Sequence, residues 1–134
     1  MTGVSDLEPG LPVVVVEDED DNRLFVRRVL ERAGYVVHAF AGATEALDFL
    51  RTTPCRVVVS DMRMPGMSGL EFTQEVRALR PDTAVVLMTA YATVDNVIEA
   101  LRLGAADLLQ KPVAKDALVA KVAELFAVAP GERV

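Results

Sequence analysis

Acidic, hydroxyl and amine side chains stand at the ends of four apolar runs of this sequence. The acids are Glu17, Asp18 and Asp61, the hydroxyl is Thr89, and the amine is Lys111. A run of valines without polar residues is typical of a strand that is buried on both faces in a parallel sheet. In an open α/β sheet the ligand crevice lies at the carboxyl ends of the strands. The five side chains are therefore placed where they could take part in chemistry.

Carboxylates that share one crevice repel one another, and a divalent cation is the usual relief of that repulsion. Oxygen ligands that are few in number suit Mg²⁺, with Mn²⁺ as an alternative. Lys111 adds a second positive charge and Thr89 adds a hydroxyl donor. This set of groups predicts a site for a phosphoryl group, with a carboxylate as the in-line nucleophile.

Strand and helix patterns alternate along the chain. Strands are predicted at Leu11–Val16, Tyr35–Phe40, Cys55–Ser60, Ala84–Met88 and Ala106–Gln110. Helices are predicted at Arg23–Arg32, Thr44–Leu50, Leu70–Leu79, Val94–Leu103 and Lys115–Phe126. This alternation predicts an α/β fold with a parallel sheet and helices on both faces. We expect a flavodoxin-like (βα)5 doubly wound sandwich with a five-stranded sheet of order 2-1-3-4-5, in which Asp18 and Asp61 share a crevice.

The length and composition are those of one soluble domain. The chain has 134 residues, a net charge of -6 and a pI near 4.8, which argues against a nucleic-acid surface. No apolar run is long enough for a membrane span, and the first residues lack a signal-peptide pattern. We predict a cytoplasmic domain that contacts neither nucleic acid nor membrane. We expect a flexible leader at 1–10, the folded domain at 11–127, and a flexible tail or the start of a linker at 128–134.

The stretches VVVVEDE, VVVSDMRMPGMSG, VVLMTA and LLQKPV together resemble the receiver domain of two-component response regulators. The resemblance implies that Asp61 accepts a phosphoryl group from the phosphohistidine of a sensor histidine kinase or from a phosphotransfer protein. It also implies that Mg²⁺ is bound by Asp18 and Asp61, by Glu17 through a water molecule, and by the backbone carbonyl of Arg63. Such a domain is a signalling receiver that assists its own phosphorylation and slow dephosphorylation, and it is not an enzyme.

Further positions receive roles from the same resemblance. Lys111 is expected to bind a phosphoryl oxygen, and Thr89 to be the switch hydroxyl that moves onto the phosphate. Ala90 is the small residue that leaves the phosphate accessible. Arg63 and Tyr91 stand at positions that tune the lifetime of the phosphate in this family.

Two positions depart from the family pattern. Leu108 stands where the family has Tyr or Phe, and Glu17 replaces the commoner Asp. Leucine can exchange between exposed and buried positions, but it supplies neither an aromatic ring nor a phenol hydroxyl. We therefore expect Tyr91 to take over part of the coupling to Thr89. The resemblance also predicts a cis peptide before Pro112.

The resemblance places the readout on the fourth helix, the fifth strand and the fifth helix. Phosphorylation is expected to change this surface and so to control an unidentified output partner or domain. The stretches MRMPGMSG and MTAYATVDNVIEALRLGAADLLQKPV look most like receivers of sigma-54-dependent transcriptional activators. A phosphorylation-dependent homodimer through this surface is an expectation on the same grounds. The sequence leaves open whether the receiver stands alone or belongs to a longer protein.

Three other classes of protein are alternatives to a receiver domain. A haloacid dehalogenase-like phosphatase needs a second Asp two residues after the first, where this chain has Arg63. A flavodoxin needs a Ser/Thr-rich phosphate loop after the first strand, where EDEDD would repel phosphate. A receiver-shaped scaffold would never take phosphate, although all the reactive groups are present. Incubation with a small acyl phosphate and Mg²⁺ distinguishes them, because only a receiver gains one phosphoryl group that depends on Asp61.

Overall fold

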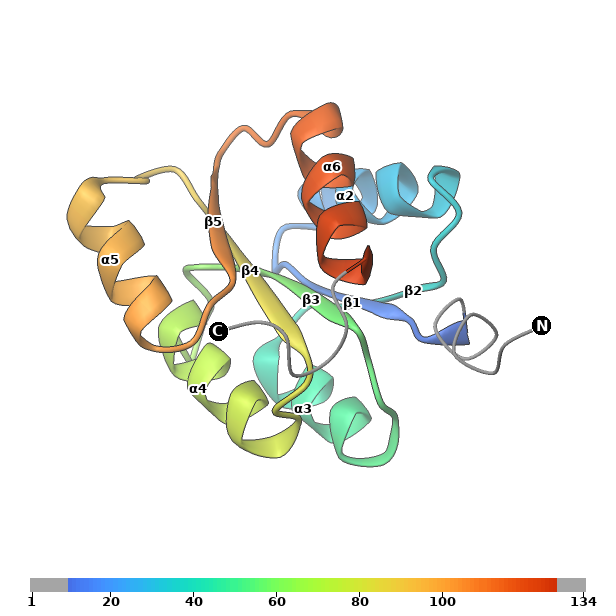
Figure 1. Cartoon of the computed structure of the whole chain (residues 1–134), viewed down its shortest axis with the longest axis horizontal. Coiled ribbons are helices and arrows are strands. Elements are labelled where there is room, and N and C mark those ends of the chain that lie inside the picture. Colours follow the sequence, from blue (N-terminus) through green and yellow to red (C-terminus); the bar gives the residue numbers. More distant parts are fainter. Residues whose placement is uncertain (1–9, 128–134) are drawn as a thin grey trace.

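The computed structural model describes residues 10–127, which form a five-stranded sheet with helices on both faces (Figure 1). The strands are β1 (Val13–Val16), β2 (Val37–Phe40), β3 (Val57–Asp61), β4 (Ala84–Thr89) and β5 (Asp107–Gln110). The helices are α2 (Asp20–Arg32), α3 (Ala43–Thr52), α4 (Gly69–Leu79), α5 (Val94–Arg102) and α6 (Lys115–Ala127). None of these described helices is long and apolar enough to cross a membrane. The predicted leader, apart from Gly10, and the predicted tail lie outside the described residues.

The strands are parallel and lie in the order β2-β1-β3-β4-β5, which confirms the predicted fold class and strand order. β1 is next to β3, with Val16 opposite Ser60. β4 is next to β5, with Thr89 opposite Gln110. The residues that follow Val16, Ser60 and Gln110 therefore emerge at the same edge of the sheet.

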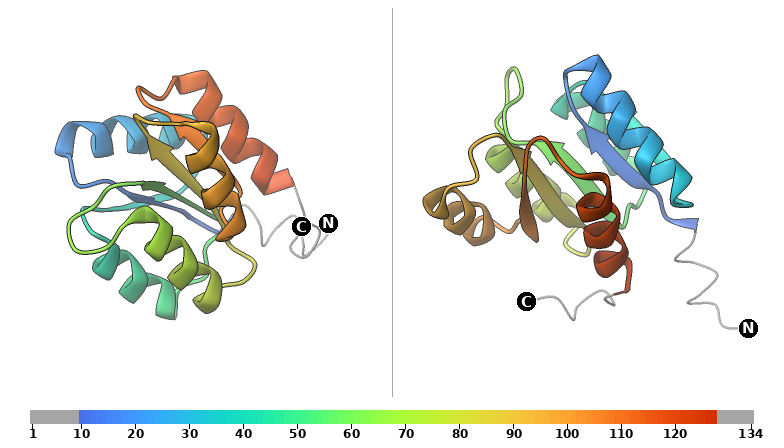
Figure 2. Two further views of the ribbon diagram at one scale, coloured as in Figure 1. Left: turned by 90° about the vertical axis from the view of Figure 1, so that its left-hand side faces the viewer. Right: turned by 90° about the horizontal axis from the view of Figure 1, so that it is seen from above.

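The sheet is covered on both faces, which explains why its central strands are apolar without alternation. On one face Val14 and Val16 of β1 pack with residues of α3, α4 and α5. On the other face Val13 and Val15 pack with residues of α2 and α6. Figure 2 shows the sheet between these two helical layers.

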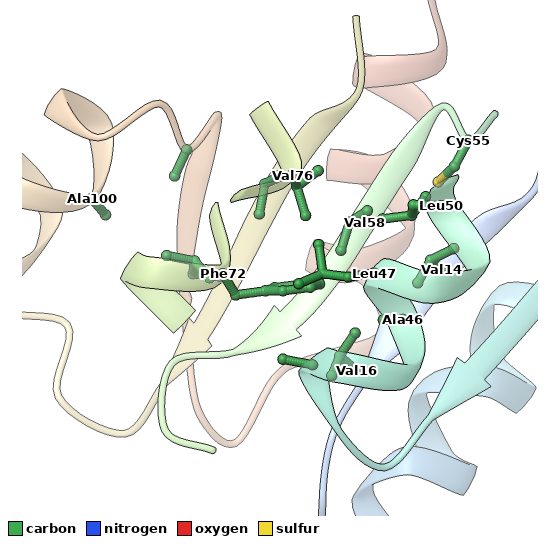
Figure 3. Packing of buried hydrophobic residues seen from close by; sticks show 14 of the residues in the cluster. Val14, Val16, Ala46, Leu47, Leu50, Cys55, Val58, Phe72, Val76 and Ala100 are labelled. Carbon is green, nitrogen blue, oxygen red and sulfur yellow. The ribbon is translucent and has the colours of Figure 1, made fainter. Parts of the chain in front are cut away.

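Phe72 of α4 has the largest of the fully buried side chains. It lies in one apolar cluster with Leu47 of α3 and Val58 of β3 (Figure 3). Full burial of a side chain of this kind stabilises the fold by about 1.5–3 kcal/mol relative to exposure. The packing of α3 and α4 against β3 therefore holds the strand that ends at Asp61.

Several element boundaries differ from the predicted ones. Helix α2 begins at Asp20 and not at Arg23, because carboxylates in the first turn interact favourably with the helix dipole. The acidic run is thus partly helical and not entirely a loop. Asp61 and Thr89 are the last residues of β3 and β4 and not the first loop residues, since their backbones continue the pairing with the neighbouring strand.

The single cysteine provides a test of this packing. Cys55 is buried just before β3, and burial raises the pKa of its thiol to about 12. Because the thiolate is the reactive form of cysteine, little of it exists at neutral pH. We expect the native protein to resist an aromatic disulfide reagent over a period in which the denatured chain reacts completely. Rapid reaction of the native protein would show that this end of the sheet opens.

Candidate functional site

Glu17, Asp61 and Lys111 meet at the carboxyl edge of the sheet. The Nζ atom of Lys111 lies 2.9 Å from Oε1 of Glu17 and 3.2 Å from Oδ2 of Asp61. Glu17 follows β1, Asp61 ends β3, and Lys111 follows β5. The strand order therefore brings together three groups that are far apart in the sequence.

The two adjacent acids after β1 lie in different surroundings. Glu17 is only 1% exposed, whereas Asp18 is exposed. The N–H of Glu17 donates to the carbonyl of Phe40 at 3.1 Å, which continues the contact of β1 with β2. Oε2 of Glu17 accepts a hydrogen bond from the N–H of Glu19 at 3.1 Å. One carboxylate is thus held inside the edge of the sheet while the next one faces solvent.

The loop that follows Asp61 folds back against the end of β3. The N–H of Gly69 donates to the carbonyl of Met62 at 2.7 Å. A Cβ atom at Gly69 would lie 2.7 Å from the main-chain oxygen of Asp61, so only glycine fits there. The Oγ atom of Ser68 caps α4 by accepting from the N–H of Glu71 at 3.1 Å, and the Glu71 carboxylate accepts from the N–H of Ser68 at 3.0 Å. These contacts fix the far end of the loop that begins after Asp61.

The pKa values of Glu17 and Lys111 are both raised, for different physical reasons. Burial raises the pKa of the Glu17 carboxyl, and the hydrogen bond from Lys111 only partly opposes this shift. Burial alone would lower the pKa of Lys111, but the hydrogen bond to Glu17 and the negative charge of Asp61 outweigh it and raise the pKa. Lys111 is therefore a stable cation at neutral pH, placed between two carboxyl groups.

The acidic side chains fit a small divalent cation. One carboxylate oxygen each from Glu17, Asp18 and Asp61 can be chosen so that all three lie within 4.8 Å of one another. These three come from two neighbouring strand ends, and they offer only oxygen donors, which Mg²⁺ prefers. The exposed Asp18 leaves one side of the cluster open to solvent, as a cation that retains water ligands requires.

A cavity of about 160 Å³ lies beside this cluster, and it is lined by Asp61, Arg63, Thr89, Ala90, Tyr91 and Lys111. Thr89 is 4% exposed, and its Oγ1 atom accepts a hydrogen bond from the N–H of Tyr91 at 3.1 Å. The guanidinium carbon of Arg63 lies 5.1 Å from the centroid of the Tyr91 ring, within the range of a cation–π contact. The cavity thus brings together Asp61, Lys111 and Thr89, with the Arg63–Tyr91 pair beside them.

Leu108 lies apart from this cavity. It is 8% exposed, belongs to the apolar cluster on the α3, α4 and α5 face, and pairs with Leu87 across the sheet. Leu108, which departs from the family aromatic, is therefore a core residue in this structure.

The Lys111–Pro112 peptide is cis, as predicted.

Two residues of the site were missed by the sequence analysis. Arg23 donates from Nη1 to the carbonyl of Glu17 at 3.0 Å. Gln110 donates from Nε2 to the carbonyl of Ala90 at 2.9 Å, which ties the loop after β4 to the end of β5. Both side chains donate to main-chain carbonyls, and such hydrogen bonds cannot be recognised from a sequence pattern. The three-residue spacing of Asp20 and Arg23 would be a signal for a local ion pair once both residues are known to lie on α2.

Comparison with known proteins identifies the family. Residues 13–123 match the family model of the response regulator receiver domain. The chain is 40% identical over 107 residues to the C4-dicarboxylate transport transcriptional regulatory protein DctD of Rhizobium meliloti (strain 1021). That alignment covers 80% of this chain but only 23% of DctD, so the chain spans less than a quarter of the length of this relative.

Solved structures show the same fold. The receiver domain of the Francisella response regulator 1452 matches with a TM-score of 0.83 and 28% identity, over 88% of this chain and 98% of that chain. The beryllofluoride-activated NtrC4 receiver domain dimer matches with a TM-score of 0.82 and 27% identity, over 87% of this chain and 94% of that chain. The chain therefore belongs to the family of response regulator receiver domains, as its sequence motifs indicated.

Proposed function

We propose that the chain accepts a phosphoryl group on Asp61 from the phosphohistidine of a sensor histidine kinase or of a phosphotransfer protein. The observation that carries this proposal is the position of Lys111, whose Nζ atom lies between the carboxylates of Glu17 and Asp61 beside a cavity. Phosphorylation on an aspartate is characteristic of the family. As a signalling domain, the chain assists its own phosphorylation and slow dephosphorylation.

In the proposed transfer an oxygen of Asp61 attacks the phosphorus atom in line with the departing imidazole. The P–N bond breaks, its electron pair returns to the imidazole, and the imidazole takes up a proton. Lys111 remains charged throughout and neutralises a phosphoryl oxygen. Ala90, exposed beside the cavity, leaves room for the incoming group.

The acidic residues would hold Mg²⁺, or Mn²⁺ in its place. We assign Asp18 and Asp61 as direct ligands, Glu17 as a ligand through water, and the backbone carbonyl of Arg63 as the remaining protein ligand. The bound ion supplies charge neutralisation to the phosphoryl oxygens. The support for this assignment is the close approach of the three carboxylates.

Thr89 is the proposed switch residue. Its hydroxyl oxygen accepts from the N–H of Tyr91, and a phosphoryl group on Asp61 offers it a charged acceptor. The phosphoryl group adds nearly two negative charges, so it favours the conformations in which Thr89 reaches toward it. Because Thr89 leads into α5, the proposed readout is the surface of α5, β5 and α6.

Thr89→Ala is expected to leave phosphorylation intact while it weakens the change at α5. The variant keeps Asp61 and Lys111 but lacks the hydroxyl that is proposed to move toward the phosphoryl group. NMR chemical-shift changes of α5 on phosphorylation measure the effect, with Thr52→Ala as a control at an exposed threonine remote from the cavity. Equal shift changes in phosphorylated Thr89→Ala and wild type would contradict the proposed role.

Two further positions tune this switch in our proposal. Arg63 and Tyr91 stack at the cavity and control how readily water reaches the phosphate. Leu108 is buried and cannot provide an aromatic ring that rotates with Thr89. We therefore propose Tyr91, which is 59% exposed, as the aromatic side chain that takes over part of the coupling to Thr89.

The output partner is proposed to bind the face of α5. This helix exposes the apolar residues Val94, Ile98 and Leu101. Exposed apolar side chains grouped on one helix are typical of an interaction surface. Since the activated NtrC4 receiver is a dimer, a phosphorylation-dependent homodimer is one form that this interaction could take here.

The proposed function is tested by incubating the protein with a small acyl phosphate in the presence and in the absence of Mg²⁺. Intact mass spectrometry is expected to show a gain of one phosphoryl group with Mg²⁺ and none with a chelator. Release of free phosphate from many organic phosphates, without a phosphorylated protein, would favour a phosphatase. No reaction of either kind would favour a receiver-shaped scaffold.

A further inference from the structure

Arg23 connects the acidic loop to the helix that follows it. Its Nη1 atom donates to the main-chain carbonyl of Glu17 at 3.0 Å, and its Nη2 atom lies 2.6 Å from Oδ1 of Asp20. The Arg23 side chain is 24% exposed, while that of Asp20 is 88% exposed. The guanidinium therefore bridges the end of the β1 segment and the first turn of α2, and the loop residues Asp18 and Glu19 lie between the two bonded positions.

The two acids at the start of this loop depend on different supports. The Glu17 carboxylate is held directly by Lys111 and by the N–H of Glu19. The Asp18 side chain is exposed, so its direction depends mainly on the backbone of residues 17–19. Two contacts hold this backbone from the side of α2: the backbone N–H of Arg23 donates to the carbonyl of Glu19 at 2.9 Å, and the Arg23 guanidinium donates to the carbonyl of Glu17 at 3.0 Å. Replacing the Arg23 side chain removes the second contact and leaves the first.

We propose that Arg23 is a positioning residue that holds the Glu17–Asp18 backbone in the conformation required to bind a divalent cation. This inference rests on the proposed metal-dependent function. Arg23 is not a ligand, since a guanidinium carries only N–H donors and a positive charge. It acts through the main chain, as partners outside the ligand set commonly do in metal sites.

The positive charge of Arg23 opposes cation binding, whereas its positioning contact favours cation binding. A cation close to the carboxylates repels a second one, so loss of this charge by itself would strengthen metal binding. Loss of the positioning contact would weaken it, typically by about 10-fold to 100-fold for residues that support metal ligands. The sign of the change in affinity therefore decides between the two effects.

The test measures the affinity of the full chain for Mn²⁺ from the electron paramagnetic resonance signal of the free ion. Arg23→Gln is expected to weaken Mn²⁺ binding by about 10-fold or more, although it adds net negative charge. Arg23→Lys keeps the charge but lacks the planar fork that reaches both acceptors, and we expect it to bind Mn²⁺ more weakly than wild type as well. Arg27→Gln removes the same charge from an exposed pair with Glu31 on the same helix, and it is expected to bind Mn²⁺ as wild type does.

The outcomes separate this inference from the proposed function. Asp18→Asn is expected to weaken Mn²⁺ binding, and its failure to do so would overturn the metal-dependent function and the inference with it. If Asp18→Asn weakens binding but Arg23→Gln binds Mn²⁺ as tightly as wild type or more tightly, only the role of Arg23 is overturned. Circular dichroism without metal checks that the variants fold, and Arg23→Lys decides the question should Arg23→Gln not fold.

Discussion

Asp61→Asn is expected to lose all transfer of a phosphoryl group from a small acyl phosphate. The amide has the shape of the carboxylate, but it is not a nucleophile under these conditions. The side chain lies 3.2 Å from Nζ of Lys111 at the edge of the described cavity. Intact mass spectrometry after incubation with acyl phosphate and Mg²⁺ measures the transfer.

The matched control is Asp48→Asn, which alters an exposed carboxylate paired with Arg51 on α3. This variant is expected to gain one phosphoryl group as fully as wild type does. A phosphoryl group on Asp61→Asn at the wild-type level would mean that another residue is the acceptor.

Lys111→Ala is expected to slow phosphorylation by about 100-fold, the usual cost of removing one charged or hydrogen-bonding group that stabilises a transition state. The Nζ atom of Lys111 contacts Glu17 at 2.9 Å and Asp61 at 3.2 Å, so its removal takes one positive charge away from beside two carboxylates. Their repulsion also opposes the approach of a negatively charged phosphoryl donor. A time course of phosphoprotein formation by mass spectrometry measures the rate.

Lys121→Ala is the control for this second variant. Lys121 forms ion pairs with Asp107 and Glu124, away from the cavity lined by Asp61 and Lys111. It should be phosphorylated at the rate of wild type. If Lys111→Ala were also phosphorylated at that rate, the lysine would have no part in holding the phosphoryl group.

The strand order and the meeting of Glu17, Asp61 and Lys111 could be predicted because they follow from the chain path. Unbroken apolar runs mark strands that are buried on both faces, and parallel strands end at one edge. The side chain that ends each run is then placed by topology alone. This is why residues distant in sequence could be assigned to one site before any coordinates were known.

The exact ends of the elements could not be predicted in the same way. The acidic run after β1 reads as a loop by composition, yet Asp20 begins α2 because the helix N-terminus favours carboxylates. Asp61 reads as the point where the chain surfaces, but the pairing of β3 with β4 keeps it in the sheet and buried. In both cases the outcome depends on neighbours that the local sequence does not specify.

Hydrogen bonds from side chains to main-chain carbonyls could not be predicted from the sequence either. Arg23 is the first residue of the predicted helix, and nothing in its spacing shows that it reaches the carbonyl of Glu17. Gln110, next to Lys111, likewise binds the carbonyl of Ala90 on another strand end. Such bonds depend on the angle at which a helix or strand leaves its loop, so they become visible only in three dimensions.

In our proposal, carboxylates, a lysine and a threonine at one sheet edge form a metal-dependent phosphate acceptor at Asp61. Reduction of the phosphorylated protein with borohydride tests it most directly, since this reagent converts an aspartyl phosphate into homoserine. Peptide mapping is expected to find homoserine at residue 61 alone, and only in samples that were phosphorylated with Mg²⁺ present. Homoserine at another aspartate, or a phosphoryl group that survives on a serine or threonine and forms without Mg²⁺, would contradict the account.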